Sequence, residues 1–158
     1  RLANSGRIRK GDTLLDYGCG KGRVDCYLSY QTRCHSIGVE YDPRIYETAA
    51  ENQKTAVSGG RTEFVLADAG EFPVPGAVNR AYFFNPFSVE LLQKVIRRIL
   101  DSWYEVSREI RLFFYYPSDE YLAYLMTVDE LVFADEIDCR ELFDGNDARE
   151  RIVEFVLE

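Results

Sequence analysis

The chain has 158 residues, of which 46% are hydrophobic, and a formal net charge of −8. This length suits one domain with a substantial core, so we expect a single domain over residues 1–158. No apolar run reaches membrane-spanning length and no segment resembles a secretory signal, which predicts a cytoplasmic protein without a membrane partner. The acidic charge disfavours a nucleic acid partner, because phosphates favour clusters of Lys and Arg.

The cysteines and the single histidine argue against a metal site. No C-x-x-C pair occurs among Cys19, Cys26, Cys34 and Cys139, and His35 is the only histidine. Reduced thiols of this kind are typical of the cytoplasm. The chain begins at Arg1 rather than at Met, so we expect a trimmed domain that lacks an N-terminal extension.

Strand and helix patterns alternate along the first half of the chain, as in a parallel α/β sheet. In order, the pattern predicts a strand at 13–15 that ends on Asp16, a helix at 24–30, a strand at 36–41, a helix from Asp42 to about 57, and a strand at 61–67. Asp42 and Pro43 suit the start of the second helix as N-cap and first helical residue.

The second half continues this alternation and ends in a hairpin. Residues 69–76 hold two prolines and predict a loop, followed by a strand at 80–84, an amphipathic helix capped by Ser88, a strand at 109–116 and a helix at 118–126. Two last strands at 131–140 and 149–157 can pair antiparallel at the sheet edge.

Three glycines at alternate positions, Gly18, Gly20 and Gly22, follow the acid that ends the first strand. Glycine tolerates positive φ and lets another molecule approach the backbone closely. The N–H groups at the start of the following helix add partial positive charge. We therefore expect a ligand-binding loop, in which Asp16 suits a cationic ligand group better than a pyrophosphate.

Polar residues also end the next strands of the predicted sheet: Glu40, Asp68 and Asn85. Ligands of open α/β sheets bind beyond the carboxyl ends of the strands, so these residues and Asp16 are expected to surround one site. Each has an ordinary alternative role: Glu40 as a strand-end acid, Asp68 as a turn cap, and Asn85 with Pro86 as a turn before the helix.

The stretch DYGCGKG, the acid of GVEYD and the tetrapeptide LADA resemble motifs of class I S-adenosylmethionine-dependent methyltransferases. The pair DYGCGKGRV and FNPF is similar to a bacterial group of such enzymes whose substrates are mostly unassigned. The resemblance implies a Rossmann-like α/β fold. Its seven-stranded, mostly parallel sheet has the order 3-2-1-4-5-7-6, helices on both faces and a C-terminal antiparallel hairpin.

The same resemblance implies S-adenosylmethionine as cofactor and a role for each strand end. Asp16 would favour its ammonium, Glu40 its ribose hydroxyls, and Asp68 with the Ala69 N–H its adenine, while Tyr41 would cover the adenine face. The loop would wrap the amino-acid part through Tyr17, Gly18, Cys19, Gly20 and Gly22. Asn85, near the transferred methyl group, is the candidate catalytic residue.

The expected activity is methyl transfer to an unidentified acceptor, a small molecule or protein rather than a nucleic acid. The sequence Asn85-Pro86-Phe87 lacks one proline of the motif of amino-nitrogen methyltransferases, and no general base is evident. A non-catalytic cofactor-binding or scaffold domain of the same fold is the main alternative. An NAD-dependent oxidoreductase is a further one, because a glycine loop and Glu40 also suit NAD. We expect a monomer or weak homodimer.

Overall fold

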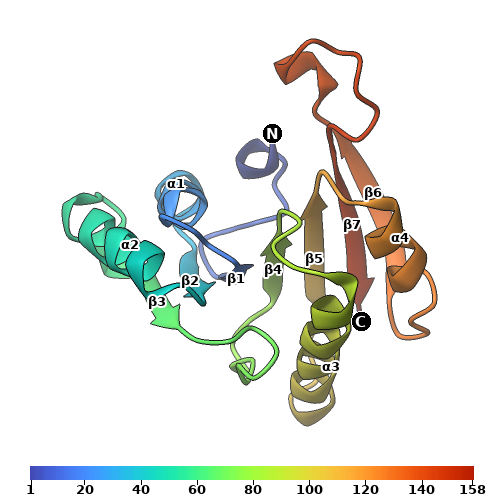
Figure 1. Ribbon diagram of the computed structural model, residues 1–158, viewed down its shortest axis with the longest axis horizontal. Helices are drawn as coiled ribbons and strands as arrows, with labels where there is room; N and C mark the ends of the chain where they lie inside the picture. Colours follow the sequence, from blue (N-terminus) through green and yellow to red (C-terminus); the bar gives the residue numbers. More distant parts are fainter.

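The computed structural model describes residues 1–158 and contains one seven-stranded sheet of order β3-β2-β1-β4-β5-β7-β6 (Figure 1). Five strands are parallel, whereas β7 pairs antiparallel with both β5 and β6. The predicted strand order is confirmed. The strands are β1 (Thr13–Tyr17), β2 (His35–Glu40), β3 (Thr62–Leu66), β4 (Arg80–Phe83), β5 (Ile110–Tyr115), β6 (Val132–Asp138) and β7 (Arg151–Leu157).

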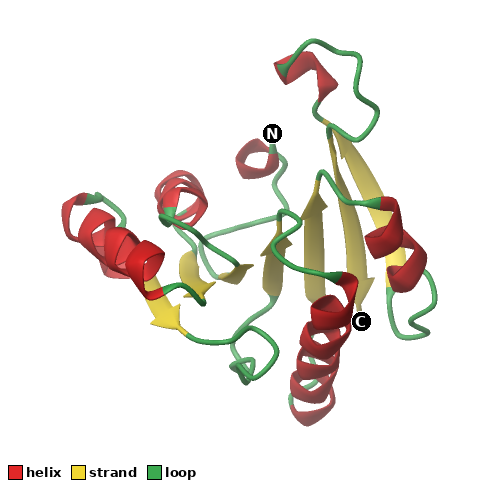
Figure 2. Ribbon diagram, viewed as in Figure 1, coloured by secondary structure: helices red, strands yellow, loops and turns green.

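Helices cover both faces of this sheet (Figure 2). One face carries α1 (Arg23–Thr32) and α2 (Pro43–Thr55), and the other carries α3 (Val89–Glu105) and α4 (Asp119–Leu125). Short 3-10 turns occupy Leu2–Asn4 (η1), Gly59–Arg61 (η2) and Arg140–Leu142 (η3). None of the helices has the length and apolar character that crossing a membrane requires.

Local side-chain caps explain where three of the helices begin. The Asp42 carboxylate accepts hydrogen bonds from the N–H groups of Arg44 and Ile45, and Pro43 is the first residue of α2. The hydroxyls of Ser88 and Ser118 accept from the N–H three residues later, at the starts of α3 and α4. These side chains satisfy N–H groups that a helix leaves unpaired, so the predicted starts are confirmed.

The last two strands are shorter than predicted, because the connection between them is long. Residues 139–150 form this β6–β7 linker, which the Asp138 and Asp147 carboxylates shape by accepting from the N–H groups of Arg140 and Arg149. Asp and Asn side chains form such turns in competition with sheet pairing. As predicted, the pair closes the sheet, with β6 at the edge.

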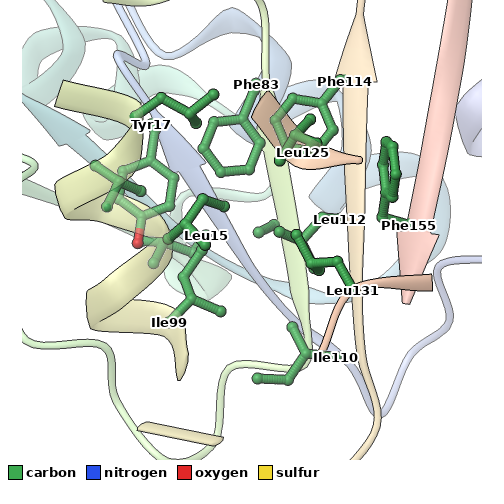
Figure 3. Close-up of a cluster of buried hydrophobic side chains, with 14 of the residues drawn as sticks. Leu15, Tyr17, Phe83, Ile99, Ile110, Leu112, Phe114, Leu125, Leu131 and Phe155 are labelled. Atoms are coloured by element: carbon green, nitrogen blue, oxygen red, sulfur yellow. The ribbon is translucent and has the colours of Figure 1, made fainter. Parts of the chain in front are cut away.

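The core lies mainly between the sheet and α3. Successive residues of a strand point to opposite faces, so Tyr17, Phe83 and Phe114 share the α3 face (Figure 3). The ring of Phe83 stacks on both, with centroids 5.0 Å from Tyr17 and 4.4 Å from Phe114. On the same three strands, Leu14, Tyr82 and Phe113 face α1 instead. The sheet thus separates two apolar layers.

Replacing Phe114, which is 1% exposed, with Ala should lower the free energy of unfolding by about 3–5 kcal/mol, because the ring leaves a cavity in the core. Phe84→Ala, at a position 56% exposed, serves as the control and should cost about 1 kcal/mol or less. Urea denaturation followed by circular dichroism measures both. Equal losses in the two variants would contradict the placement of the core.

Candidate functional site

The carboxyl ends of β1, β2, β3 and β4 surround a hollow of about 360 Å³, which we name the strand-end cleft. Five of the predicted site residues line it, together with Phe87 of the loop after β4: Gly18, Glu40, Tyr41, Asp68 and Ala69. The only charged side chains of this lining are the carboxylates of Glu40 and Asp68. The cleft therefore suits a ligand with positive charge and hydrogen-bond donors.

The three positions of the loop favour glycine for different structural reasons. All three have positive φ, but a Cβ on Gly18 would lie 2.6 Å from the Cβ of Pro86, and one on Gly22 would lie 2.3 Å from the ring of Phe64. A Cβ on Gly20 would meet nothing within 4 Å. The first and last glycines allow close packing, whereas Gly20 leaves bare backbone facing open space.

Glu40 links the glycine loop to the start of α2. Its Oε1 accepts from the Gly20 N–H at 3.1 Å and its Oε2 accepts from the Asp42 N–H at 2.9 Å. The N–H groups of Gly18 and Cys19 both donate to the Val39 carbonyl. Since each carboxylate oxygen has a second lone pair, Glu40 can still accept hydrogen bonds from a ligand.

At the end of β3, the Asp68 carboxylate both shapes the chain and faces the cleft. Its Oδ1 accepts from the Gly70 N–H at 2.9 Å, the turn role that the sequence also allowed. Its second oxygen has no partner within the chain, and neither has the N–H of the buried Ala69. One acceptor and one donor therefore remain available side by side.

Asn85 lies outside the strand-end cleft and joins the ends of β4 and β5. With φ of +40°, it donates from Nδ2 to the Tyr116 carbonyl, and its Oδ1 accepts from the Ser118 N–H at 3.3 Å. Positive φ in a non-glycine residue is a strained state that its surroundings must hold. Its amide thus fixes the backbone at this strand end, and Pro86 and Phe87 line the cleft in its place.

Three other predicted residues lie away from the cleft surface. The Tyr17 ring is in the core below Phe87, with its hydroxyl unpaired. Burial, with the nearby charges of Asp25, Asp16 and Glu40, raises the pKa of the Cys19 thiol, which is therefore protonated at neutral pH. Asp16 is only 3% exposed, and its partner is Asp25.

Asp16 and Asp25 form a buried carboxyl pair that the sequence analysis missed. Their carboxyl groups lie within hydrogen-bonding reach, and Asp25 is fully buried without an N–H or O–H donor from any other residue. Two ionised carboxylates cannot hydrogen-bond, so the contact requires a proton on one of them. The helical spacing of Asp25 with the buried Leu28 and Ser29 was the available signal, since it places Asp25 on the inner face of α1.

The negative charge of this pair destabilises the folded protein, because no cation neutralises it. Burial, and then the charge of Glu40, raises the pKa of Asp16 to about 6, against the opposing effect of its hydrogen bond with Asp25. Burial and the charge of Asp16 raise the pKa of Asp25 well above its usual value. The pair therefore holds one proton and one negative charge next to the glycine loop at neutral pH.

The sheet order and the strand-end cleft together define a Rossmann-like α/β domain, a fold that binds its ligands at this edge of the sheet. The sequence model of a family described as "Methyltransferase domain" matches residues 14–109. The chain belongs to this family. The predicted class I S-adenosylmethionine-dependent methyltransferase is thereby confirmed as its class, with S-adenosylmethionine as the cofactor of that class.

One sequence relative supports this family membership. The 27-O-demethylrifamycin SV methyltransferase of Amycolatopsis mediterranei is 28% identical over 112 residues, which are 71% of this chain and 38% of that protein. The chain thus spans well under half the length of this relative.

Two solved structures share the fold. An RNA methyltransferase from Salinibacter ruber, in complex with S-adenosyl-L-homocysteine, has a TM-score of 0.61 at 18% identity and covers 99% of this chain and 84% of its own. A TehB-like SAM-dependent methyltransferase from Corynebacterium glutamicum has a TM-score of 0.71 at 17% identity and covers 100% and 85%.

The buried carboxyl pair should make the stability of the protein depend on pH. Because the folded-state pKa values of Asp16 and Asp25 are raised, the folded protein binds the extra protons, and stability decreases as the pH rises from about 4 through 6 and above. Asp25→Asn keeps the size and supplies an uncharged donor. It should stabilise the protein at pH 8 by about 1–3 kcal/mol, with little change at pH 5.

Thermal unfolding of the wild type, Asp25→Asn and the exposed control Asp101→Asn across pH 5–8 measures this effect. The control should follow the wild-type curve. A loss of stability in Asp25→Asn at pH 8 would show that the second carboxylate has a partner and is held ionised.

Proposed function

We propose that the strand-end cleft binds S-adenosylmethionine and that the protein transfers its methyl group to an acceptor. The observation that carries this proposal is the position of Glu40. Its carboxylate accepts a hydrogen bond from the Gly20 N–H of the glycine loop and faces the same cleft as Asp68. Acids at neighbouring strand ends and a bare glycine backbone converge on one hollow. The family membership supports the same ligand.

The residues of the cleft fit the parts of this cofactor. Glu40 would accept from the ribose hydroxyls, and the exposed Tyr41 would cover the adenine face. The free Asp68 oxygen would accept from the adenine amine, and the Ala69 N–H would donate to a ring nitrogen. Gly18, Cys19, Gly20 and Gly22, with Tyr17 contributing backbone alone, would surround the amino-acid part, where Asp16 and Asp25 supply negative charge for the ammonium.

Bound S-adenosylmethionine supplies a methyl group on a sulfonium that carries its own leaving group. The chain's task is to position two reactants and exclude water. Asn85 would contribute by holding the β4 and β5 ends in register, since its amide joins Tyr116 and Ser118. We retain it as a positioning residue beside the reacting atoms.

The acid that precedes the glycine loop disfavours the NAD alternative, because a pyrophosphate on that loop would lie near the negative charge that Asp16 and Asp25 share. Among proteins of this fold, the named relatives act on an RNA and on a demethylrifamycin. For this chain the net charge of −8 favours a small molecule or protein as acceptor. A cytoplasmic location, a single domain and a monomer or weak homodimer remain our predictions.

The first test is calorimetric binding to Glu40→Gln, which keeps the size of the side chain and removes its charge. The Kd for S-adenosylhomocysteine should rise about 10- to 100-fold, because charge-assisted hydrogen bonds to the ribose are lost. Glu63→Gln, an exposed acid on β3, is the matched control and should bind as the wild type does. Binding of NAD but not of S-adenosylhomocysteine by the wild type would refute the proposal.

A second test distinguishes a glycine that close packing requires, Gly22, from a glycine that faces open space, Gly20. Gly20→Ala should fold with a loss of about 1–2 kcal/mol for its left-handed backbone, yet bind S-adenosylhomocysteine at least about tenfold more weakly, because its methyl group enters the open space. Gly22→Ala should lose about 2–5 kcal/mol of stability through its clash with Phe64. Unaltered affinity in a folded Gly20→Ala variant would place the ligand elsewhere.

A further inference from the structure

A second hollow lies on the α1 face of the sheet, away from the large core. We name this space of about 310 Å³ the aromatic pocket. It is lined by Val24 and Tyr27 of α1, Tyr82 of β4, Tyr115 of β5 and Phe143 of the β6–β7 linker. Three tyrosines and a phenylalanine around one space favour a flat apolar occupant.

Residues of the aromatic pocket lie close in the chain to the glycine loop and to the end of β4. Its lining residue Arg23 directly follows Gly22, the last glycine of the loop. On the other side, the ring of Phe84, next to Asn85 in the chain, lies 4.8 Å from the ring of Tyr115. Figure 1 shows the β6–β7 linker and the N-terminal turn at the same end of the sheet, beyond the carboxyl ends of β4 and β5. The aromatic pocket therefore lies at the same edge of the sheet as the strand-end cleft.

The charges of the aromatic pocket are opposite to those of the protein as a whole. Its only charged lining residues are Arg1 and Arg23, in a chain of net charge −8. Arg1 pairs with Glu141 at 2.5 Å, whereas Arg23 makes no ion pair or hydrogen bond through its side chain. Arg23 is exposed, so its guanidinium is free to pair with an anionic oxygen on the occupant.

Tyr82 adds a hydrogen-bond donor to this lining. It is 9% exposed, and its hydroxyl has no hydrogen-bond partner within the chain, while the Tyr115 hydroxyl donates to Glu150 at 2.7 Å. Burial and the nearby carboxylate of Asp16 raise the pKa of Tyr82, so that it keeps its proton. A hydroxyl that lines the pocket and has no partner in the chain is free to donate to a ligand oxygen.

The lining contains no residue able to act as a general base. It includes no His, Lys, Asp or Glu, and burial raises the pKa of Tyr115 and of the Cys139 thiol, so both keep their protons. The occupant must therefore arrive with a nucleophile that needs no base. A hydroxyl on an aromatic or enolic ring system meets this condition, because it ionises readily beside a guanidinium.

From these observations we propose that the aromatic pocket holds the methyl acceptor, and that the acceptor is a flat aromatic molecule with an acidic hydroxyl, oriented by Arg23 and Tyr82. This inference rests on the proposed function. The ionised oxygen of the acceptor would form the O–CH₃ bond with its lone pair. The electrons of the S–CH₃ bond would pass to sulfur, leaving a neutral thioether, and no proton would move in this step.

The test uses three flat probes of similar size: 4-hydroxycoumarin as the acidic hydroxyl, coumarin as the neutral match and 1-naphthylmethylamine as the cation. Calorimetry on protein saturated with S-adenosylhomocysteine should rank 4-hydroxycoumarin first. Its affinity should fall about tenfold in Arg23→Gln and several-fold in Tyr82→Phe, which keeps the ring. Arg97→Gln on α3 and Tyr30→Phe, on α1 outside the pocket, are the matched controls and should leave it unchanged. Mass spectrometry with S-adenosylmethionine should then detect the O-methylated product.

The outcomes separate this inference from the proposed function. If S-adenosylhomocysteine binds but 4-hydroxycoumarin does not, or binds equally well to Arg23→Gln, the acceptor assignment is wrong and the cofactor cleft stands. Preference for the cationic probe would likewise overturn the assignment. If S-adenosylhomocysteine fails to bind, the proposed function fails and the acceptor role fails with it, whatever the probes do.

Discussion

The site depends on one carboxylate that joins two backbone segments. Glu40 at the end of β2 accepts from Gly20 on one side and from Asp42 on the other, so a single side chain sets the distance between the glycine loop and the start of α2. The parallel pairing of β1 with β2 brings these segments together. Removing one charged group should therefore affect the shape of the cleft as well as its charge.

The glycine loop in turn lies between tightly packed neighbours. Pro86 and Phe64 occupy the space that side chains at Gly18 and Gly22 would need, which fixes the loop from both ends while Gly20 stays open. The unneutralised pair of Asp16 and Asp25 lies behind this loop. The buried negative charge lowers the stability of the fold at the place where a cationic ligand would lie. Destabilising features of this kind are common at functional sites.

Side chains that alternate along β4 and β5 face two different environments. Phe83 and Phe114 point toward α3 and are fully packed, whereas Tyr82 and Tyr115 point toward α1 and line a pocket. The two aromatic-rich strands therefore contribute to the core on one face of the sheet and to a pocket lining on the other. The order of aromatic residues along β4 and β5 does not by itself distinguish the two positions, because the distinction depends on which helices cover each face.

The sequence by itself determined the local elements and the family. The glycine spacing after Asp16, the caps at Asp42, Ser88 and Ser118, and the alternation of strands and helices depend on neighbouring residues, so they were visible in the chain. Only the tertiary structure decided that Asp16 pairs with Asp25, that Tyr17 enters the core and that Asn85 holds Tyr116 and Ser118. Those outcomes depend on contacts between segments distant in sequence, which set burial and hydrogen bonding and which no local pattern records.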